Sequence, residues 1–409
     1  MEQLTSALIY AGAFISVLGL VVFVHEFGHY QVGRWCGIAV KSFSIGFGKE
    51  WFGWTDRHGT RWKVSRIPIG GFVSWADDSD PTSAGPATEE HKSLSLEEAR
   101  ARGHFRAMPI WKRAAATAAG PAANFVFSIS VIAVLLMTHG RDATDYARLP
   151  ARVDGVQAGS AAATAGLSVG DVILRADTTD IPSFAALQTY VADRAGQPVT
   201  LTVRREGADI TVPITPDRAE VPDARGGAPR TVGRLGIART LLPEERVMER
   251  LGPLAAIGAG AQSTWNYVAV TGAYIGAVLT GKASGDQISG PAGIFAASGQ
   301  VATEALGMGA EQDQRSAVER AGALALSLLN WAALLSVAVG IANLLPIPLL
   351  DGGQLVFFAA EAVRGGKPLP ARVQEAAFWT GAFTLASLFL FATWNDVQRH
   401  WQDLQNFFS

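Results

Sequence analysis

Long apolar stretches occur four times along this chain, and each is long enough to cross a lipid bilayer as a helix. The hydrocarbon core of a bilayer is about 30 Å thick and requires about 20 consecutive apolar residues. The uncharged stretches that meet this length are residues 7–24, 114–140, 321–350 and 376–395. The hydrophobic pattern therefore predicts a multi-pass α-helical membrane protein with four transmembrane helices.

A fifth uncharged stretch, residues 253–281, is richer in glycine and in small polar residues than the other four. Its Trp265 and Tyr267 are of residue types that favour a membrane–water interface. We therefore expect this stretch to lie along the outward-facing surface of the membrane and not to cross the bilayer. The sequence leaves open whether it also dips into the membrane.

Between residues 145 and 217 the pattern becomes that of a small, β-rich soluble domain. Short apolar stretches predict four strands, and residues 183–194 have the apolar spacing of an amphipathic helix. The predicted strands are residues 151–153, 172–175, 199–204 and 210–214. Residues 217–233 are rich in proline, glycine and charge, and they are predicted to form a linker.

Charge sets the expected orientation of these segments. Charged residues make up only 17% of the chain, against about 25% in soluble domains, which agrees with segments embedded in a bilayer. The net charge of −2 gives no indication of a nucleic-acid partner. The region between the first two apolar stretches is rich in basic residues, which favours its location in the cytoplasm. Among them are Arg34, Lys41, Lys49, Arg57, Arg61, Lys63, Arg66, Arg106, Lys112 and Arg113. The β-rich domain is then predicted to lie outside, which for a protein of the bacterial inner membrane means the periplasm.

The first apolar stretch leads directly into the sequence His25-Glu26-Phe27-Gly28-His29. Two histidines four residues apart share one face of a helix and can bind one metal ion, and the glutamate between them can accept a proton from water. An HExxH pattern alone arises by chance in many proteins, but ionisable groups within a transmembrane helix are costly and usually functional. We predict that His25 and His29 are metal ligands and that Glu26 is the catalytic base.

A catalytic zinc ion takes three protein ligands and keeps one position open for water. The single cysteine, Cys36, excludes a cysteine-rich zinc module. Asp351 is the best candidate for the third ligand, because it ends the apolar stretch 321–350 within the sequence NLLPIPLLDGG. The two prolines are expected to break the helix, and the two glycines to free the backbone around the carboxylate.

Together these motifs resemble the site-2 protease family of intramembrane zinc metalloproteases, in particular its bacterial regulator-of-sigma-E type. Residues 68–73 resemble the family's membrane-associated β-loop, residues 113–124 its second helix, and residues 288–294 the stretch before its third helix. Residues 159–173 resemble a PDZ domain, which captures peptide ends by adding a strand to a sheet edge. The best-known family members carry two tandem PDZ domains, whereas this chain has room for one.

The resemblance implies that the metal is Zn²⁺ and that water attacks a peptide bond with the help of Glu26. It also implies that Asn343 contacts the substrate backbone. The residues implied to pair with the substrate as an edge strand are Gly70, Gly71, Phe72 and Val73. A transmembrane helix must unwind to be cut, and its freed backbone groups then need new partners. The implied partners are a transmembrane substrate such as an anti-sigma factor, a site-1-type protease that trims it first, and membrane lipid.

The number of membrane crossings tests the assignment of the fifth stretch. The two histidines and Asp351 can meet only if the first and third transmembrane helices both run from outside to inside. An additional crossing by residues 253–281 would place Asp351 on the opposite face of the membrane. The three-ligand site therefore requires four crossings.

The predicted segments follow the chain from a first transmembrane helix with the HExxH motif to a short tail. They are transmembrane helix 1 (residues 1–30), the cytoplasmic β-loop region (31–112), transmembrane helix 2 (113–140), the periplasmic PDZ-like domain (145–217), a periplasmic linker with membrane-surface helices (218–320), transmembrane helix 3 with the metal-binding aspartate (321–352), a cytoplasmic loop (353–374), transmembrane helix 4 (375–396) and the tail (397–409). The active site is expected toward the cytoplasmic side.

Two other functions are weighed against the protease. A catalytically silent, membrane-anchored PDZ scaffold or chaperone could bind periplasmic peptide ends, but it would have no need for Glu26. A metal transporter usually places polar residues in several helices, whereas the second and fourth apolar stretches carry no charged residue.

The remaining histidines considered as ligands, all expected to be solvated surface residues, are His58, His91, His104 and His139. The tryptophans expected to anchor the chain at the membrane interface are Trp51, Trp54, Trp62 and Trp75.

Overall fold

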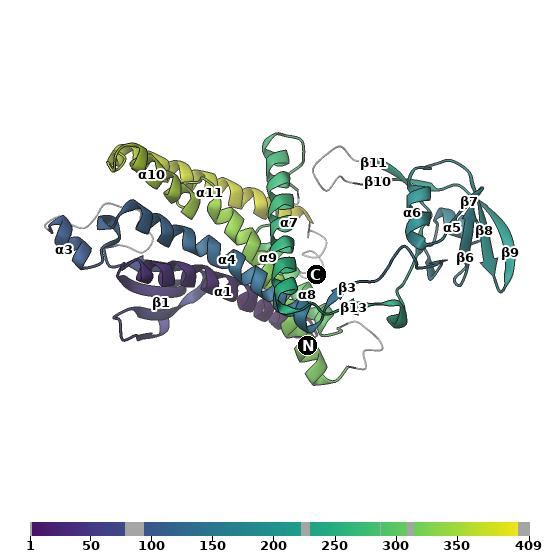
Figure 1. Ribbon diagram of the computed structural model, residues 1–409, viewed down its shortest axis with the longest axis horizontal. Helices are drawn as coiled ribbons and strands as arrows, with labels where there is room; N and C mark the ends of the chain where they lie inside the picture. Colours follow the sequence, from purple (N-terminus) through teal and green to yellow (C-terminus); the bar gives the residue numbers. More distant parts are fainter. Residues whose placement is uncertain (1, 78–93, 222–229, 287, 309–314, 400–409) are drawn as a thin grey trace. The chain divides into compact units, whose positions relative to one another are not determined.

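The computed structural model describes all of the chain except residues 1, 78–93, 222–229, 287, 309–314 and 400–409 (Figure 1). The chain divides into two compact units. The first, a helical unit, consists of residues 1–134, 257–269 and 285–409. The second, a β-rich unit, consists of residues 135–256 and 270–284.

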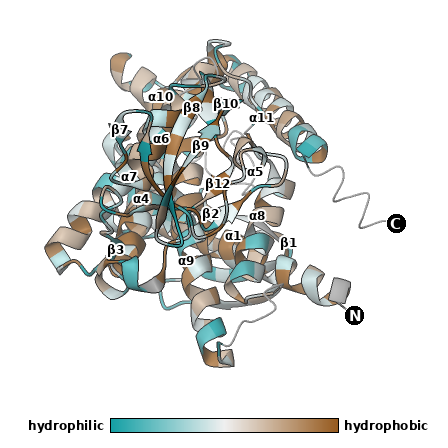
Figure 2. Ribbon diagram, turned by 90° about the vertical axis from the view of Figure 1, so that its right-hand side faces the viewer, coloured by the Kyte–Doolittle hydropathy of each residue, from teal (hydrophilic) through white to brown (hydrophobic). Residues whose placement is uncertain are grey.

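Among the described residues, four helices are long and apolar enough to cross a membrane. They are α1 (Glu2–Trp35), α4 (Ile110–Thr138), α9 (Ala317–Leu344) and α11 (Ala371–Arg399). Their hydrophobic residues are coloured brown in Figure 2. Four spanning helices were predicted from the sequence, and this number of candidate spans is confirmed. Helix α7 (Pro253–Leu279), which contains most of the fifth apolar stretch, is not one of them.

Helices α1, α4 and α9 form the core of the helical unit. Val17 and Val21 on α1 are buried against Ala332 and Leu335 on α9. Further along, His25 and His29 in the C-terminal part of α1 meet Asp351, which follows the C-terminal end of α9, so these two helices run in the same direction, as the three-ligand site requires. At Gly28 a Cβ atom would lie 2.3 Å from the carbonyl oxygen of a residue on α4, so these two backbones are in close contact.

Helix α8 (Pro291–Ala305) packs along the N-terminal half of α1. The ring of Phe295 lies 5.8 Å from that of Tyr10 and 5.7 Å from that of Phe14. A Cβ atom at Gly299 would lie 2.0 Å from the Tyr10 ring, so glycine is required at this contact. The sequence assigned this region to membrane-surface helices. The structure packs α8 against a segment of α1 that is a candidate span, and the placement of α8 at the membrane surface stays a prediction.

Strands β1 (Val40–Thr55) and β2 (Arg61–Trp75) form the predicted β-loop. Both strands bend, so that residues 40–45 pair with residues 71–75 on one side and with residues 61–64 on the other. Residues 50–55 pair with 61–65. The segment 71–75 is therefore at an edge of this small sheet, as expected for a strand that accepts a further partner.

The β-rich unit contains a sheet with the order β4-β6-β8-β9, and β7 pairs with β6. The predicted strands and the predicted helix are all present. The elements are β4 (Ala151–Arg152), β6 (Val172–Ala176), β7 (Thr179–Asp180), β8 (Val199–Arg205), β9 (Ala208–Ile214), α5 (Ala161–Thr164) and α6 (Phe184–Ala192). Val153, Ile173, Leu187 and Leu201 lie in one buried cluster that holds the sheet against α6.

The prediction of a linker at residues 217–233 is wrong for residues 217–221 and 230–233, while residues 222–229 lie outside the described residues. Strand β10 (Asp217–Val221) pairs with β11 (Arg230–Arg234), and β12 (Ile237–Ala238) pairs with β5 (Gly155–Val156). Leu235, between β11 and β12, is 5% exposed and belongs to the core of the domain. Pairing of these backbone groups with other strands outweighs the local preference for a loop, and the domain extends to about residue 238.

The remaining elements connect these parts. They are α3 (Leu96–Ala101), the 3₁₀ turns η1 (Phe105–Ala107) and η2 (Pro243–Glu245), β3 (Arg141–Asp142) paired with β13 (Met248–Glu249), and α10 (Asp351–Val363).

Candidate metal centre

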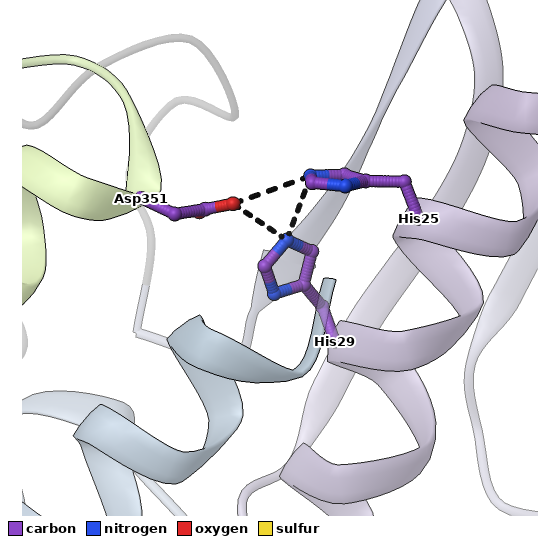
Figure 3. Close-up of side chains that lie close together, drawn as sticks. All are labelled: His25, His29 and Asp351. Carbon is purple, nitrogen blue, oxygen red and sulfur yellow. Dashed lines mark hydrogen bonds and ion pairs between the residues drawn. The ribbon is translucent and has the colours of Figure 1, made fainter. Parts of the chain in front are cut away.

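His25 and His29 lie one turn apart on α1 and point in the same direction (Figure 3). Each histidine is 8% exposed, so both imidazoles are buried inside the helical unit. The apolar sequence before them keeps the helix continuous to Trp35, beyond the predicted end at residue 30. The helix therefore presents two nitrogen ligands on one buried face.

Asp351 completes a group of three potential metal ligands. Its Oδ2 atom lies 3.3 Å from His25 Nε2 and 3.4 Å from His29 Nε2, and the two Nε2 atoms are 3.1 Å apart. Atoms bound tetrahedrally to zinc at 2.0–2.2 Å lie about 3.3–3.6 Å from one another. The Asp351 Oδ2 atom is buried and has no hydrogen-bond partner among the described residues. The donor atoms and their spacing therefore fit zinc.

Helix α4 fixes the other nitrogen of each imidazole. His29 Nδ1 lies 2.8 Å from the carbonyl oxygen of Ala116. Because a carbonyl oxygen can only accept, Nδ1 is the donor of this hydrogen bond. His25 Nδ1 lies 3.1 Å from the side-chain amide of Asn124, which is fully buried. An acceptor at Nδ1 selects the imidazole form that leaves Nε2 free for a metal, and the carbonyl oxygen of Ala116 is such an acceptor for His29. At His25 the Asn124 amide acts in this way when it presents its oxygen to Nδ1. Both rings are thus held with Nε2 toward Asp351.

The position of Asp351 corrects one detail of the prediction. Asp351 does not end the third spanning helix: α9 ends at Leu344, and Asp351 is the first residue of α10. The helix ends just before Pro346, as the proline rule predicts. In the turn that follows, Leu349 has a φ of 93°, a conformation that costs about 1–3 kcal/mol for a non-glycine residue. Such strain is often found next to functional groups.

The two glycines after Asp351 were predicted to free the backbone around the carboxylate, but the structure gives them a different role. A Cβ atom at Gly352 would lie 2.3 Å from the carbonyl oxygen of Leu344, and one at Gly353 would lie 2.3 Å from that of Ile347. Neither glycine has a positive φ. They therefore allow the start of α10 to pack closely on the preceding turn, which restricts the backbone beside the carboxylate.

Glu26 lies between the metal ligands and the edge of the β-loop. Its side chain is 9% exposed, and its carboxylate interacts with the backbone of Val73 on β2. A Cβ atom at Gly71 would lie 3.1 Å from Glu26 Cγ and 2.7 Å from Val22 on α1. A larger residue at Gly71 would push the strand away from α1.

Asp56, in the turn between β1 and β2, ties the β-loop to α1. Tyr30 on α1 and Trp62 on β2 both donate hydrogen bonds to its carboxylate, at 3.1 and 3.0 Å. The backbone amides of His58 and Thr60 donate to the other oxygen. Burial alone would raise the pKa of Asp56, but these hydrogen bonds lower it to about 2. The carboxylate is therefore charged at neutral pH and anchors the sheet beside Glu26.

The residues predicted to bind substrate occupy two places. Gly70, Gly71, Phe72 and Val73 follow one another on β2, and the last three pair with β1. Gly70 has a φ of 81° and packs against the Phe47 ring. Asn343 lies in the last turn of α9, and its amide nitrogen donates to the carbonyl oxygen of Val339, at 3.0 Å. Its carboxamide oxygen is the group that could receive a hydrogen bond from a substrate.

The sequence did not identify Ala116, Gly120 and Asn124 as parts of this site. A Cβ atom at Gly120 would lie 2.2 Å from His29 Nε2, so only glycine leaves room for the ring. The signal available in the sequence was their spacing of four residues in an apolar helix. Small residues at that spacing allow close helix contacts. A backbone carbonyl, however, carries no sequence signal at all.

The expectation that the other histidines are exposed was only partly right, and the role of the tryptophans as membrane anchors stays a prediction. His58 and His139 are exposed, whereas His104 is 7% exposed, and His91 lies outside the described residues. Trp51 and Trp54 are exposed, at 79% and 50%. Trp62 stacks on Phe43 inside the β-loop, and Trp75 stacks on Phe105 of the turn η1.

A second candidate site lies within the β-rich domain. A cavity of about 750 Å³ is bounded by α6, by residues 155–160 and by residues 233–238. Val156, Leu187 and Ile237 give it an apolar lining, and Gln188 and Arg234 add polar groups. The cavity thus combines an apolar surface with a few groups that could orient a ligand.

Comparison with known proteins gives matches along nearly the whole chain. A family model described as peptidase family M50 matches residues 13–388. A protein of Agrobacterium fabrum named as a zinc metalloprotease is 42% identical over 388 residues, and the match covers 95% of each chain. The metalloprotease MmpA of Caulobacter vibrioides is 39% identical, with 94% of each chain covered. The regulator of sigma-E protease RseP of Salmonella typhimurium is 29% identical, with 95% of this chain and 98% of the relative covered.

Proposed function

Because this chain belongs to peptidase family M50 and is a zinc metalloprotease, we propose that it cuts transmembrane proteins within the bilayer, with zinc held by His25, His29 and Asp351. The observation that carries this proposal is the convergence of three buried ligand atoms within 3.4 Å of one another in a helical unit with four candidate spans. A buried metal site of this kind can act only on a substrate that enters the membrane region.

Each residue of the site has a defined role in the proposed reaction. A bound zinc ion supplies Lewis acidity, which makes water more acidic and polarises a carbonyl oxygen. Glu26 lies beside the ligands without being one of the three, and it accepts the proton from the attacking water. It then delivers that proton to the amide nitrogen that leaves. Neighbouring α4 holds both imidazoles so that they do not turn during these steps.

The edge strand of the β-loop gives the substrate a place to bind in extended form. Residues 71–75 pair on one side with β1, and they pass beside Glu26. We infer that the unwound substrate pairs with the other side, with Gly70, Gly71, Phe72 and Val73 as its partners. Asn343 would contact its backbone through the free carboxamide oxygen. Such pairing satisfies the backbone groups that unwinding exposes in an apolar setting.

The relatives and the charge pattern support a proposal for the biological setting. The name of the Salmonella relative links that protein to the regulation of sigma-E. By analogy, we propose that the substrate here is an anti-sigma factor or a similar single-pass protein, first trimmed by a site-1-type protease. We place the enzyme in the bacterial inner membrane with its metal site toward the cytoplasm, because the β-loop region is rich in basic residues.

We further propose that residues 145–238 form a periplasmic PDZ-like domain that receives peptide ends. The cavity beside α6 supports this proposal, because a peptide placed there would lie between a helix and the strand β12. Arg234 at its border provides a positive charge near a ligand's carboxylate. The sequence had offered no such group within residues 155–170.

The central test is cleavage of single-pass membrane substrates by the purified full-length enzyme. Cleavage should occur with zinc, stop when a chelator removes it, and return when zinc is added again. A substrate helix containing helix-destabilising residues near the cytoplasmic side should be cut faster, because it unwinds more easily. Cleavage that continues unchanged in chelator would contradict the proposed mechanism.

A further inference from the structure

One face of α4 contacts both histidine ligands and the helix that begins with Asp351. Its residues are spaced by three or four positions and therefore lie in one stripe along the helix. The stripe consists of Arg113, Ala116, Gly120 and Asn124. The last three contact the two histidine ligands. Arg113 contacts α10 instead, the helix whose first residue is Asp351.

The contact between Arg113 and α10 is a buried ion pair with Glu361. Arg113 Nη2 lies 2.6 Å from Glu361 Oε1, and Nη1 lies 3.2 Å from Oε2. The side chains are only 11% and 12% exposed. Arg113 Nε also donates to the carbonyl oxygen of Met108, at 3.0 Å. The guanidinium is thus fixed in a two-point geometry that lysine could not reproduce.

An aromatic chain supports the same connection. The Arg113 guanidinium lies 5.0 Å from the centre of the Phe358 ring, and Phe358 is one turn before Glu361 on α10. The Phe358 ring contacts Phe105 at 6.2 Å, and Phe105 stacks on Trp75 at 5.1 Å. Trp75 in turn fills the space beside Gly33, where a Cβ atom would lie 2.5 Å from its ring. Gly33 is one turn beyond the second histidine ligand on α1.

The geometry of α10 links this anchor to the metal ligand. Asp351 and Phe358 are seven residues apart and therefore share one face of the helix. Glu361 lies about 15 Å from Asp351 along the helix axis, at about 1.5 Å per residue. Gly352 and Gly353 pack the first turn of α10 against the turn before it, so a displacement at Glu361 acts as a tilt of the helix about this contact. A tilt of α10 at Glu361 would consequently move the Asp351 carboxylate.

We propose that Arg113 and Glu361 are positioning residues, which hold α10 so that Asp351 stays in reach of the metal bound by the two histidines. A metal site tolerates displacements of only about 0.5 Å in its ligands. The affinity for zinc should therefore depend on this ion pair, although neither residue touches the metal. The inference rests on the zinc site of the proposed function but not on the cleavage reaction.

The test measures zinc affinity of the full-length protein in detergent by competition with a chelator of known affinity. Glu361→Gln removes the charge at constant size, and Arg113→Lys keeps the charge but loses the two-point contact. Each should lower zinc affinity about tenfold or more, the range found when supporting residues of metal sites are changed. Combining Arg113→Glu with Glu361→Arg restores a pair and should return the affinity to within about threefold of the unaltered protein.

The matched control is Arg205→Lys in the β-rich domain. Arg205 forms a similar two-point pair with Asp171, at 2.7 Å to each oxygen. This variant should leave zinc affinity unchanged even if it lowers the melting temperature. Absorption of the Co²⁺-substituted protein gives a second readout: loss of the Asp351 ligand in Glu361→Gln should alter the spectrum, which a general loss of stability would not do.

Two results would overturn the inference. One is zinc affinity within about twofold of the unaltered protein in both single variants. The other applies if neither single variant folds. In that case, a charge-swapped protein that folds but has lost its zinc affinity would contradict the inference, and a charge-swapped protein that still binds zinc would support it. His25→Ala in the same assay separates the two levels of the argument. If His25→Ala keeps its zinc, the proposed site is wrong; if it loses zinc while Glu361→Gln does not, only the positioning role is wrong.

Discussion

The side-chain amide nitrogen of Asn124 on α4 lies 3.1 Å from Nδ1 of His25 on α1. A neutral imidazole that binds zinc through Nε2 carries its proton on Nδ1, so it needs an acceptor there. Turning the amide by half a rotation would place its Oδ1 atom in that position. Oδ1 has no hydrogen-bond partner among the described residues, so the rotation breaks no contact of that atom. We expect this orientation when zinc is bound.

Asn124→Ala should therefore weaken zinc binding. The ring of His25 would lose the acceptor that selects its metal-binding form, and losses of this type reduce affinity about 10- to 100-fold. Ser128→Ala is the control, because Ser128 is equally buried one turn further along α4 but contacts Thr264 instead of a ligand. Equal zinc affinity in the two variants would show that Asn124 has no role at the metal.

Glu26→Gln should abolish cleavage without removing zinc. The amide is nearly the same size but cannot accept a proton from water, and general base catalysis contributes about 10²–10⁴-fold. Zinc content and cleavage of a membrane substrate would be measured on the same preparation. Glu98→Gln, on the exposed helix α3, is a control that should retain full activity. Near-normal cleavage by Glu26→Gln would require a different base.

Gly120→Ala tests the contact between α4 and His29. Its methyl group would lie 2.2 Å from Nε2, the atom expected to bind zinc, so the ring must move. We expect a large loss of bound zinc and of activity. At Gly19 on α1, no atom lies within 4 Å of the added methyl group. Gly19→Ala should keep its zinc and can gain up to about 1 kcal/mol of helix stability. Zinc retained in Gly120→Ala would contradict the arrangement of these helices.

The orientation in the membrane can be tested by cysteine labelling in a Cys36→Ala background. Single cysteines near Asp56 and Gly365 should be protected from an impermeant reagent added outside intact cells. Cysteines near Gly207 and Ser284 should react, because the β-rich domain and the end of α7 are predicted to be periplasmic. If the site near Ser284 were protected while that near Gly207 reacted, α7 would have to cross the bilayer.

Deleting the PDZ-like domain should change which substrates are cut. The deletion should remove residues 145–238, because stopping at residue 216 would leave Leu235 without the core in which it is buried. If the domain excludes bulky substrates, the shortened enzyme will bind zinc normally and cut a substrate that still carries a large periplasmic domain. Slower cutting of a trimmed substrate, with the long one still refused, would instead indicate that the domain recruits substrates.

The amino-acid sequence by itself determined the features that depend on local pattern. Hydrophobic length gave the four candidate spans, because a helix of about 20 residues matches the bilayer wherever the chain folds. The spacing of His25 and His29 required only that the helix continue through them. The proline-containing turn also pointed to Asp351 as the candidate third ligand, because a carboxylate next to a long apolar stretch is costly unless it is paired or binds a metal.

Tertiary structure alone decided which parts of the chain support that site. The carbonyl of Ala116, the missing side chain of Gly120 and the ion pair of Arg113 with Glu361 join positions up to 248 residues apart. The sequence pattern indicates the periodicity within one helix or strand, but it does not indicate which faces of two such elements pack together. For the same reason residues 217–233 were predicted to be a linker: their strands are stabilised by pairing and by burial of Leu235, which exist only once the domain has folded.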